Sequence, residues 1–425
     1  MNLKRSFVLF VSLIFLNLLS AEGKILAIED AVRLAKENNI SVKKAENDLD
    51  SLAVQNKYSW NSVSPAAKLN GNFEDDIEND STAFSLSGAV NLSLKTNLYS
   101  EIKGAKLNYE KGLLTYSEAV RQIELSVRKK FYNLIYQKEN LVLQNRSLET
   151  SRAQYLNNEE KFKNGKISEL DAFTSRVNYE SKKPVVESAE INFQNDLASF
   201  KQLLGIPQET EIALDGSLDD FLNLKEISFD LLPKVDEPAP DVKSAEYDVE
   251  IAKNSLLNLR FSAYAPVITG SFSYGKSKKS MQDDWMTTNQ LSVGVSVPLD
   301  GILPWSSSAV KIKEQKNALD TAEKVLEDAK TTVAVQTESY IRKINQAVKQ
   351  LDSLKSTEKL AEQTYKMTLA AYNYGKTDFL SLQNANDSVL SAGVNLKSQA
   401  YTLISTILDL ESVLGLEFGT LETKK

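Results

Sequence analysis

The sequence predicts a mainly helical chain that folds as two tandem copies of a long helical hairpin, each copy carrying a pair of β-strands. Three observations support this fold class. A glycine-containing turn occurs twice, with Gly165 and Gly375 lying 210 residues apart in a chain of 425. Each turn lies between two long segments with helical periodicity. Each copy also contains two segments in which apolar and polar residues alternate. A fixed offset of nearly half the chain indicates a tandem duplication.

The two turns have the same design. Residues 162–170 and 372–380 each place a glycine where a helix can end in the left-handed conformation. Three residues after the glycines, Ser168 and Asp378 can cap the helix that follows. Each turn is therefore predicted to be the bend of a helical hairpin.

The composition narrows the possible functions. The chain has no cysteine and no histidine, and only 16 glycines and 9 prolines, which is typical of a helix-rich protein with few loops. Without cysteine and histidine, thiol nucleophiles, imidazole bases and the common zinc sites are excluded. No nucleophile-base pair, phosphate loop or metal cluster is visible, so neither an enzyme nor a cofactor is expected. The formal charge of -7 disfavours nucleic acid as a partner, because phosphate binding needs a basic surface.

Residues 1–21 are predicted to be a secretory signal peptide. A basic start, an apolar run and a small-residue exit follow one another in Lys4-Arg5, Phe7–Leu19 and Ser20-Ala21. The alternative is a membrane anchor, but the run is shorter than the ~20 residues that a spanning helix needs. No other stretch is long and apolar enough for such a helix. If the protein enters a membrane, it is expected to do so with strands.

The mature chain divides into a first repeat, residues 22–207, and a second repeat, residues 241–416. After a short amphipathic helix at 28–39, the first repeat begins with a helix at about 40–63. The motif Val42–Asp48 in this helix matches Val242–Asp248 in the second repeat.

A predicted strand pair follows a proline in each repeat, at 66–95 and 266–300. Apolar residues alternate with small polar ones over about ten residues, which is typical of outer-membrane barrel strands with lipid on one side and water on the other. The alternative is a half-buried hairpin of a soluble sheet. The clearest strand shows the pattern, with Val90 and Leu92 on its apolar face and Asn91 and Ser93 on its polar face.

The helical hairpins are predicted at residues 100–204 and 307–414. Their outgoing helices would be about 90–100 Å long at 1.5 Å per residue. Apolar residues three and four apart continue along the outgoing and returning helices, which indicates coiled-coil packing. Pro184 is expected to bend or break its helix.

Residues 208–240, between the repeats, are predicted to be irregular, with a possible short strand at 211–214. Six apolar residues suggest that this segment packs against the helices: Phe221, Leu222, Leu224, Phe229, Leu231 and Leu232. Residues 417–425 are expected to be only a short charged tail.

Four strands cannot close a membrane barrel alone, because an open edge in lipid leaves backbone groups without partners. Two chains would supply eight strands and three would supply twelve. Eight-stranded barrels are filled by side chains, whereas twelve strands leave a lumen that suits the small polar inner face. The expected assembly is therefore a homotrimer with a 12-stranded β-barrel, continued by a coiled-coil α-barrel.

With this combination of features, the chain resembles the TolC-type outer-membrane efflux proteins. The turn sequences at 160–165 and 370–375 are similar to the turn motifs of that family, and the resemblance covers nearly the whole mature chain. It implies a homotrimeric exit duct in the cell outer membrane, in contact with outer-membrane lipid and with a large periplasmic portion. It also implies docking to a periplasmic adaptor (membrane fusion) protein and to an inner-membrane efflux pump or type I secretion transporter. The cargo could be drugs, metal ions or polypeptides.

The resemblance implies functional residues at the tip of the hairpins. Tyr372 and Asp171 match a family link across the tip, although helix capping is an alternative role for Asp171 and for Asp378. Where the family has a basic residue, this chain has Thr377, with Lys376 beside it as a possible substitute. Two acidic positions of the family are Ser381 and Asn384 here, so the family's ion pairs do not carry over. The turns around Gly165, Lys166, Gly375 and Lys376 are implied to dock the adaptor.

Two other classes of protein fit the sequence less well. Periplasmic coiled-coil adaptors or structural proteins carry one hairpin between small β domains, not two hairpins that each follow alternating strands. A diffusion porin would have many more alternating segments and almost no helix. The acidic pairs Asp75-Asp76 and Asp283-Asp284 are expected in the gaps between the predicted strands, and these gaps are expected to be the extracellular loops.

Overall fold

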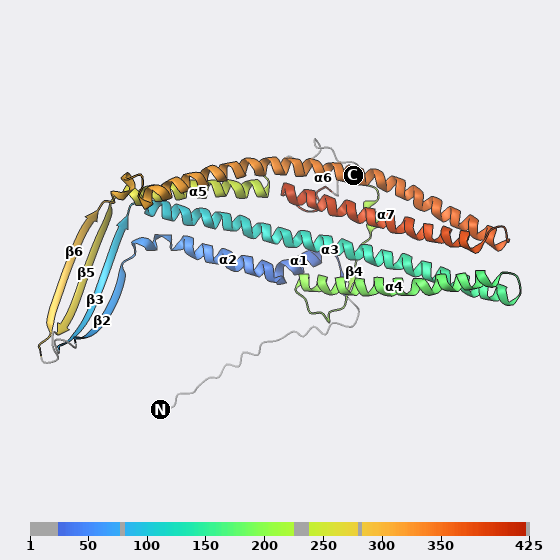
Figure 1. Cartoon of the computed structure of the whole chain (residues 1–425), viewed down its shortest axis with the longest axis horizontal. Coiled ribbons are helices and arrows are strands. Elements are labelled where there is room, and N and C mark those ends of the chain that lie inside the picture. The colour runs from blue at the N-terminus through green and yellow to red at the C-terminus, as the bar shows by residue number, and fades with distance from the viewer. Residues whose placement is uncertain (1–23, 77–80, 225–237, 279–282, 422–425) are drawn as a thin grey trace, which may run out of the picture.

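The computed structural model describes residues 24–76, 81–224, 238–278 and 283–421. The molecule is elongated, with a small sheet at one end and two helical hairpins that run to their turns at the other end (Figure 1). The predicted signal peptide lies outside the described residues.

The two repeats have the same order of elements. The first contains α2 (Ile40–Lys57), β2 (Ala66–Asp76), β3 (Ser81–Lys95), α3 (Leu98–Lys163) and α4 (Glu169–Leu204). The second contains α5 (Pro240–Tyr264), β5 (Val267–Lys278), β6 (Met286–Ser296), α6 (Ser307–Asn373) and α7 (Phe379–Leu414). The return helices α4 and α7 are both 36 residues long, and the outgoing helices α3 and α6 have 66 and 67 residues. Near-equal helices place the two turns side by side at the same end.

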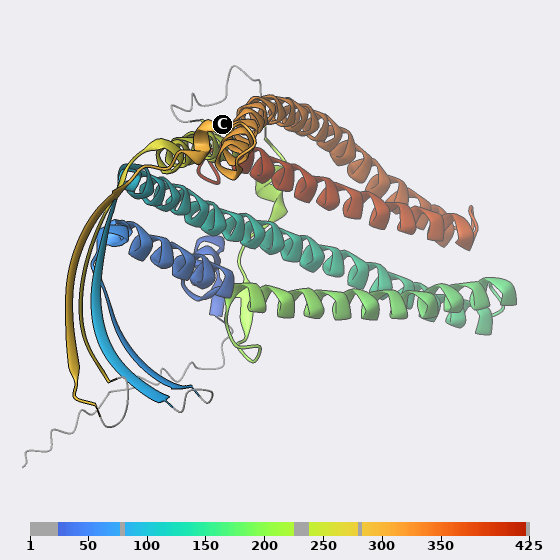
Figure 2. The same cartoon turned by 60° about the vertical axis from the view of Figure 1, so that its left-hand side comes forward.

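The four longer strands form one antiparallel sheet in the order β2-β3-β5-β6. The hairpins of the two repeats are joined by pairing between β3 and β5. Figure 2 shows the strands arching together as one curved sheet. Within the described part of the chain, β2 and β6 each have a neighbour on one side only, so the sheet has two open edges.

The helices form a layer whose order changes along the molecule. Near the sheet, α2 and α5 pack on either side of α3, and α6 packs beside α5. Toward the turns, α4 packs on α3, α3 packs on α7, and α7 packs on α6. The outgoing helices α3 and α6 therefore run the full length of the helical part, whereas two shorter helices, α2 and α4 or α5 and α7, follow one another beside each of them.

The prediction that Pro184 bends or breaks its helix is wrong on the second point, because α4 continues through this residue. Proline removes one backbone hydrogen bond and costs about 3 kcal/mol inside a helix. Tertiary contacts hold α4 next to this proline: two residues earlier, the Lys182 ammonium donates to Ser147 Oγ and to Asp387 Oδ1, both at 2.8 Å.

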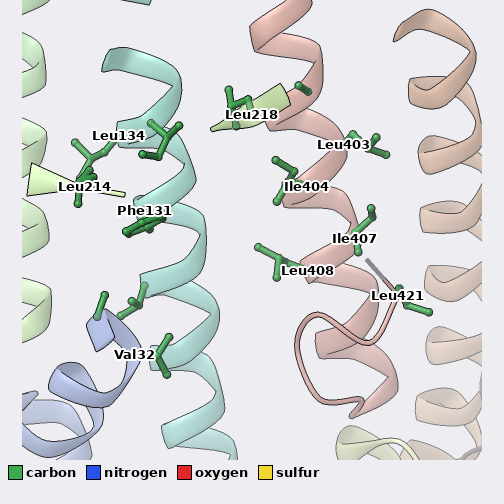
Figure 3. Packing of buried hydrophobic residues seen from close by; sticks show 14 of the residues in the cluster. Val32, Phe131, Leu134, Leu214, Leu218, Leu403, Ile404, Ile407, Leu408 and Leu421 are labelled. Atoms are coloured by element: carbon green, nitrogen blue, oxygen red, sulfur yellow. The ribbon is translucent and has the colours of Figure 1, made fainter. Parts of the chain in front are cut away.

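The main apolar core lies near the middle of the molecule. It gathers α3, α7, the short helix α1 (Ile28–Asn38), strand β4 (Ile212–Leu214) and the short 3-10 helix η2 (Leu218–Phe221). Figure 3 shows buried side chains of this core, with Phe131 and Leu134 on α3 and Ile404 and Ile407 on α7. The Phe131 and Phe200 rings pack at 6.2 Å between centroids and join α3 to α4.

The segment between the repeats contributes to this core. The predicted strand at 211–214 is confirmed as β4, which pairs in parallel with β1 (Lys24–Leu26). Phe221, Leu222 and Leu224 pack against the core as predicted. The other three apolar residues named for this segment, Phe229, Leu231 and Leu232, lie outside the described residues.

The residues after α7 are not simply a charged tail, which corrects the prediction for 417–425. They turn back at Gly415, which has a φ of +71°, and Leu421 is buried in the core. The Glu411 carboxylate accepts the backbone N–H of Leu421 at 2.8 Å and that of Gly419 at 3.0 Å. Among the charged residues of this tail, Phe418 and Leu421 are the apolar side chains that make the return favourable.

Candidate functional site

The two faces of the sheet have different chemistry. In the β3-β5-β6 register, Val90 lies opposite Phe272, and Phe272 lies opposite Leu291, so apolar residues of three strands share one face. In the neighbouring row, Asn91, Ser271 and Ser292 share the other face. The described part of the chain does not cover the apolar face: the exposed fractions are 49% for Phe272 and 77% for Leu291. Such a sheet is suited to lipid on the apolar side and water on the polar side.

The two hairpin turns are built identically. Gly165 and Gly375 have φ values of +68° and +70°. Lys166 N–H donates to Lys161 O, and Gly165 N–H donates to Phe162 O, both at 2.8 Å. The same pair of bonds joins Lys376 to Ala371 and Gly375 to Tyr372. This is the Schellman arrangement, which satisfies the last carbonyls of the outgoing helix.

The return helices begin with side-chain caps. Ser168 Oγ accepts the Asp171 N–H at 3.1 Å and donates to Asp171 Oδ2 at 2.8 Å. Asp378 Oδ1 accepts the Ser381 N–H at 2.7 Å, and hydrogen bonds from Ser381 lower the pKa of this carboxyl group. Ser168 and Asp378 thus cap the return helices, and Asp171 supports the first cap by accepting the Ser168 hydroxyl. Lys376 and Asn384 are exposed side chains near the same turn.

Within the chain, Tyr372 does not form the link to Asp171 that the resemblance implied. Its hydroxyl donates to Asn158 Oδ1 at 2.7 Å. Its ring packs against Phe379 at 6.0 Å, and the Lys161 ammonium lies 4.7 Å from the ring centroid. Burial raises the pKa of Tyr372, and the negative charge of Asp171 adds to the shift. Tyr372 therefore ties α6 to α3 of the other hairpin, about one helical turn before the bend at Gly375 and about two turns before the bend at Gly165.

Asn158 is a functional candidate that the sequence analysis missed. It is completely buried, and its Nδ2 has no hydrogen-bond partner among the described residues. An amide in a predicted apolar seam is the signal that could have identified it, because a buried polar group requires a partner.

Polar contacts continue between the two hairpins, farther from the turns than Asn158. Asn386 Nδ2 donates to Ser147 Oγ at 3.3 Å, and the Lys182–Asp387 ion pair lies beside them. Nearer the turns, Gln154 Nε2 donates to the Tyr365 hydroxyl at 3.4 Å. The hairpins are thus joined near their tips through polar side chains, whereas their apolar core lies at mid-length.

Neither metal chemistry nor a helical membrane span is indicated in the described part of the chain. It contains no group of three or more acidic residues placed to hold a metal ion. Among the described helices, none is both long enough and apolar enough to cross a lipid bilayer.

Comparisons with known proteins agree with this geometry. The family model described as outer membrane efflux protein matches residues 231–416. The outer membrane protein TolC of Vibrio cholerae is 19% identical over 306 residues, which cover 71% of this chain and 69% of the relative.

The fold is also found in solved structures of outer-membrane channels. The CmeC outer membrane channel of Campylobacter jejuni superposes with a TM-score of 0.77 at 18% identity, covering 91% of this chain and 85% of that one. The open state of the MtrE outer membrane channel of Neisseria gonorrhoeae gives 0.72 at 18% identity, with 92% and 89% covered. The outer membrane protein VceC of Vibrio cholerae gives 0.73 at 12% identity, with 92% and 96% covered.

Proposed function

We infer that this chain is an outer membrane efflux protein of the TolC type and that it works as a passive exit duct across the outer membrane. One observation carries the inference. A four-stranded sheet with an uncovered apolar face leads through short connectors into α3 and α6, which have 66 and 67 residues. At 1.5 Å per residue these helices reach about 100 Å, enough to carry a conduit far from the membrane.

The open sheet edges favour a ring of three chains. Because β2 and β6 run antiparallel to their sheet neighbours, β6 of one copy can pair with β2 of the next in the same antiparallel pattern. Such head-to-tail contacts close into a ring. Three copies give twelve strands, and the serines and asparagines of the polar face then line a water-filled lumen.

Uncovered apolar side chains on the outer helices support the same closure. On α4, Leu170, Val177 and Ile191 are more than half exposed and are spaced by multiples of seven residues. On α6, Leu360 and Met367 are also more than half exposed and seven residues apart. Seven-residue spacing is the pattern of a coiled-coil seam. These two stripes fit a contact between α4 of one copy and α6 of its neighbour.

The partners follow from the position of the ends. With the sheet in the outer membrane, the turns at Gly165 and Gly375 lie at the far periplasmic end. We propose that a periplasmic adaptor docks there and connects the duct to an inner-membrane transporter. The duct itself performs no chemistry, and its partners select the cargo.

Mass and conductance test this function. We expect the detergent-extracted outer-membrane complex to have the mass of three chains and to give a small, steady conductance in a planar bilayer. A monomer recovered from the periplasmic fraction, without channel activity, would instead support a periplasmic coiled-coil adaptor or structural protein.

We propose that Tyr372 helps to keep the tip narrow. Removing its hydroxyl with Tyr372→Phe leaves the buried Asn158 Oδ1 without its donor and should cost about 1–3 kcal/mol. A cost of this size raises the open population by roughly five- to 150-fold, so the conductance should increase. Asp171→Ala, which removes the cap partner of Ser168, should act in the same direction.

Tyr374→Phe is the matched control, because Tyr374 lies on the same turn and is 80% exposed. Unchanged conductance in both Tyr372→Phe and Asp171→Ala would contradict this role.

A further inference from the structure

The connector between β6 and α6 exposes an unusual amount of apolar surface. Residues 297–306 present five large apolar side chains to the outside: Val297, Leu299, Ile302, Leu303 and Trp305. The exposed fractions of Ile302 and Trp305 are 67% and 78%. In the first repeat, the corresponding connector consists only of Thr96 and Asn97. The apolar connector is therefore a feature of the second repeat.

The connector is held in one conformation by its own contacts. The short helix η4 (Asp300–Ile302) brings Gly301 against the end of α5, where the Tyr264 hydroxyl donates to Gly301 O at 3.0 Å. A Cβ at Gly301 would lie 2.8 Å from Ala263 O, so only glycine allows this approach. At the other end of the connector, Ser306 N–H donates to Leu303 O, and Ser306 Oγ caps α6. A preformed connector can present apolar side chains without a further loss of chain entropy.

The connector extends the apolar face of the sheet. Leu291, Val293 and Val295 lie on that face of β6, and Val297 and Leu299 continue the same alternation. β6 has 11 residues, so a tilt of about 40° gives it a height of about 25–30 Å, close to the apolar band of a membrane barrel.

Aromatic residues bracket this band. At its outer end, Trp285 packs edge-to-face on Phe84 at 5.6 Å, and the Lys278 ammonium lies 5.5 Å from the Trp285 ring centroid. At its inner end, the exposed tryptophan is Trp305. Tryptophan is enriched at both boundaries between lipid and water.

The charge at the start of α6 also favours contact with lipid. The first ten residues of α6, 307–316, carry three lysines and one glutamate. Lys311 and Lys313 are exposed just beyond Trp305 along the chain, where phospholipid phosphates would lie.

We propose that residues 297–305 form an in-plane lipid anchor, which inserts into the boundary between head groups and acyl chains of the periplasmic leaflet. This inference rests on the proposed function, because it requires the sheet to lie in the outer membrane. The anchor holds the junction between barrel and helices at a fixed depth, and the lysines of α6 bind lipid phosphate.

Tryptophan fluorescence tests the anchor directly, because the chain has only three tryptophans. A variant with Trp60→Phe and Trp285→Phe reports on Trp305 alone. The assembled variant is placed in phospholipid vesicles that carry bromine on the upper part of the acyl chains. We expect blue-shifted emission, strong quenching by the brominated lipid and weak quenching by aqueous iodide. A control variant has all three tryptophans replaced by Phe and carries Tyr374→Trp at the tip, so iodide alone should quench it.

Two outcomes would overturn the anchor: quenching of Trp305 by iodide and not by lipid, or protection from both quenchers, which would mean that protein covers the connector. Conductance of the same sample distinguishes failure of the anchor from failure of the proposed duct. A working duct should conduct whether or not the connector inserts into lipid. If Trp285→Phe prevents assembly, the difference in lipid quenching between wild type and Trp305→Ser gives the same information. A loss of quenching in Trp305→Ser supports the anchor, and no loss contradicts it.

Discussion

A Val293→Lys substitution should abolish assembly of the channel in the outer membrane. Val293 is 76% exposed, lies between Leu291 and Val295 on the apolar face of β6, and is paired with Gly270 of β5. A lysine on the lipid face of a membrane barrel costs about 2–4 kcal/mol near the midplane. In the proposed trimer, three copies bring the total to roughly 6–12 kcal/mol, comparable with the whole stability of a typical domain.

The matched control is one residue away. Ser292→Lys places the same charge on the opposite face, because side chains alternate across a strand. We expect this variant to assemble, since its ammonium reaches water in the lumen, and to conduct cations less well than the wild type. The measurements are the yield of outer-membrane trimer and the reversal potential in a salt gradient. Normal assembly of Val293→Lys together with failure of Ser292→Lys would mean that the faces are assigned the wrong way round.

The fold could be predicted because its elements leave simple periodic patterns. Positive φ at both glycines, caps at Ser168 and Asp378, and period-2 alternation in the strands are local features of the chain. The unbroken helix through Pro184 could not be predicted, since the Lys182–Asp387 contact that supports it joins residues 205 positions apart.

The tip was harder to predict than the fold. Both Tyr372 and Asp171 were identified as candidates, but the partner of Tyr372 is Asn158 on a different hairpin. The register between α3 and α6 decides which side chains meet, and periodicity does not determine that register. Similarly, nothing in the charged sequence around Phe418 indicates that α3 provides the surface on which it packs.

Substitution of Arg121 on α3 should have the second large effect, a loss of stability, because Arg121 forms part of that surface. The Arg121 guanidinium donates to the carbonyl oxygens of Glu411 and Leu416 and lies 4.8 Å from the Phe418 ring centroid. It therefore connects the first repeat to the residues after α7. Arg121→Ala would leave the Leu416 carbonyl oxygen without this donor, whereas the Glu411 carbonyl oxygen still accepts the Leu416 N–H at 2.9 Å. Loss of a donor to a buried acceptor should cost about 1–3 kcal/mol. The midpoint of thermal dissociation in detergent should fall accordingly.

Arg33→Ala is the control, because Arg33 pairs with Asp30 at an exposed site where an ion pair contributes little. Equal midpoints for the two variants would refute the importance of this contact.

The buried Glu411 makes the same contact sensitive to pH. Burial raises the pKa of its carboxyl group, even though the N–H groups of Leu421 and Gly419 and the nearby arginines favour the charged form. A pKa that is higher in the folded chain than in the unfolded chain means that the unfolded chain loses its proton first. The contribution of Glu411 to stability is therefore complete below the ordinary value of 4.5 and decreases as the pH rises through the raised pKa. Glu411→Gln removes this titration and keeps one acceptor oxygen, whereas Glu411→Ala removes both carboxylate oxygens that accept the Leu421 and Gly419 N–H groups. We expect the midpoint of Glu411→Gln, relative to wild type, to improve between pH 4 and pH 7, and Glu411→Ala to be less stable than Glu411→Gln at both. A difference between wild type and Glu411→Gln that does not change with pH would show that Glu411 does not titrate in this range.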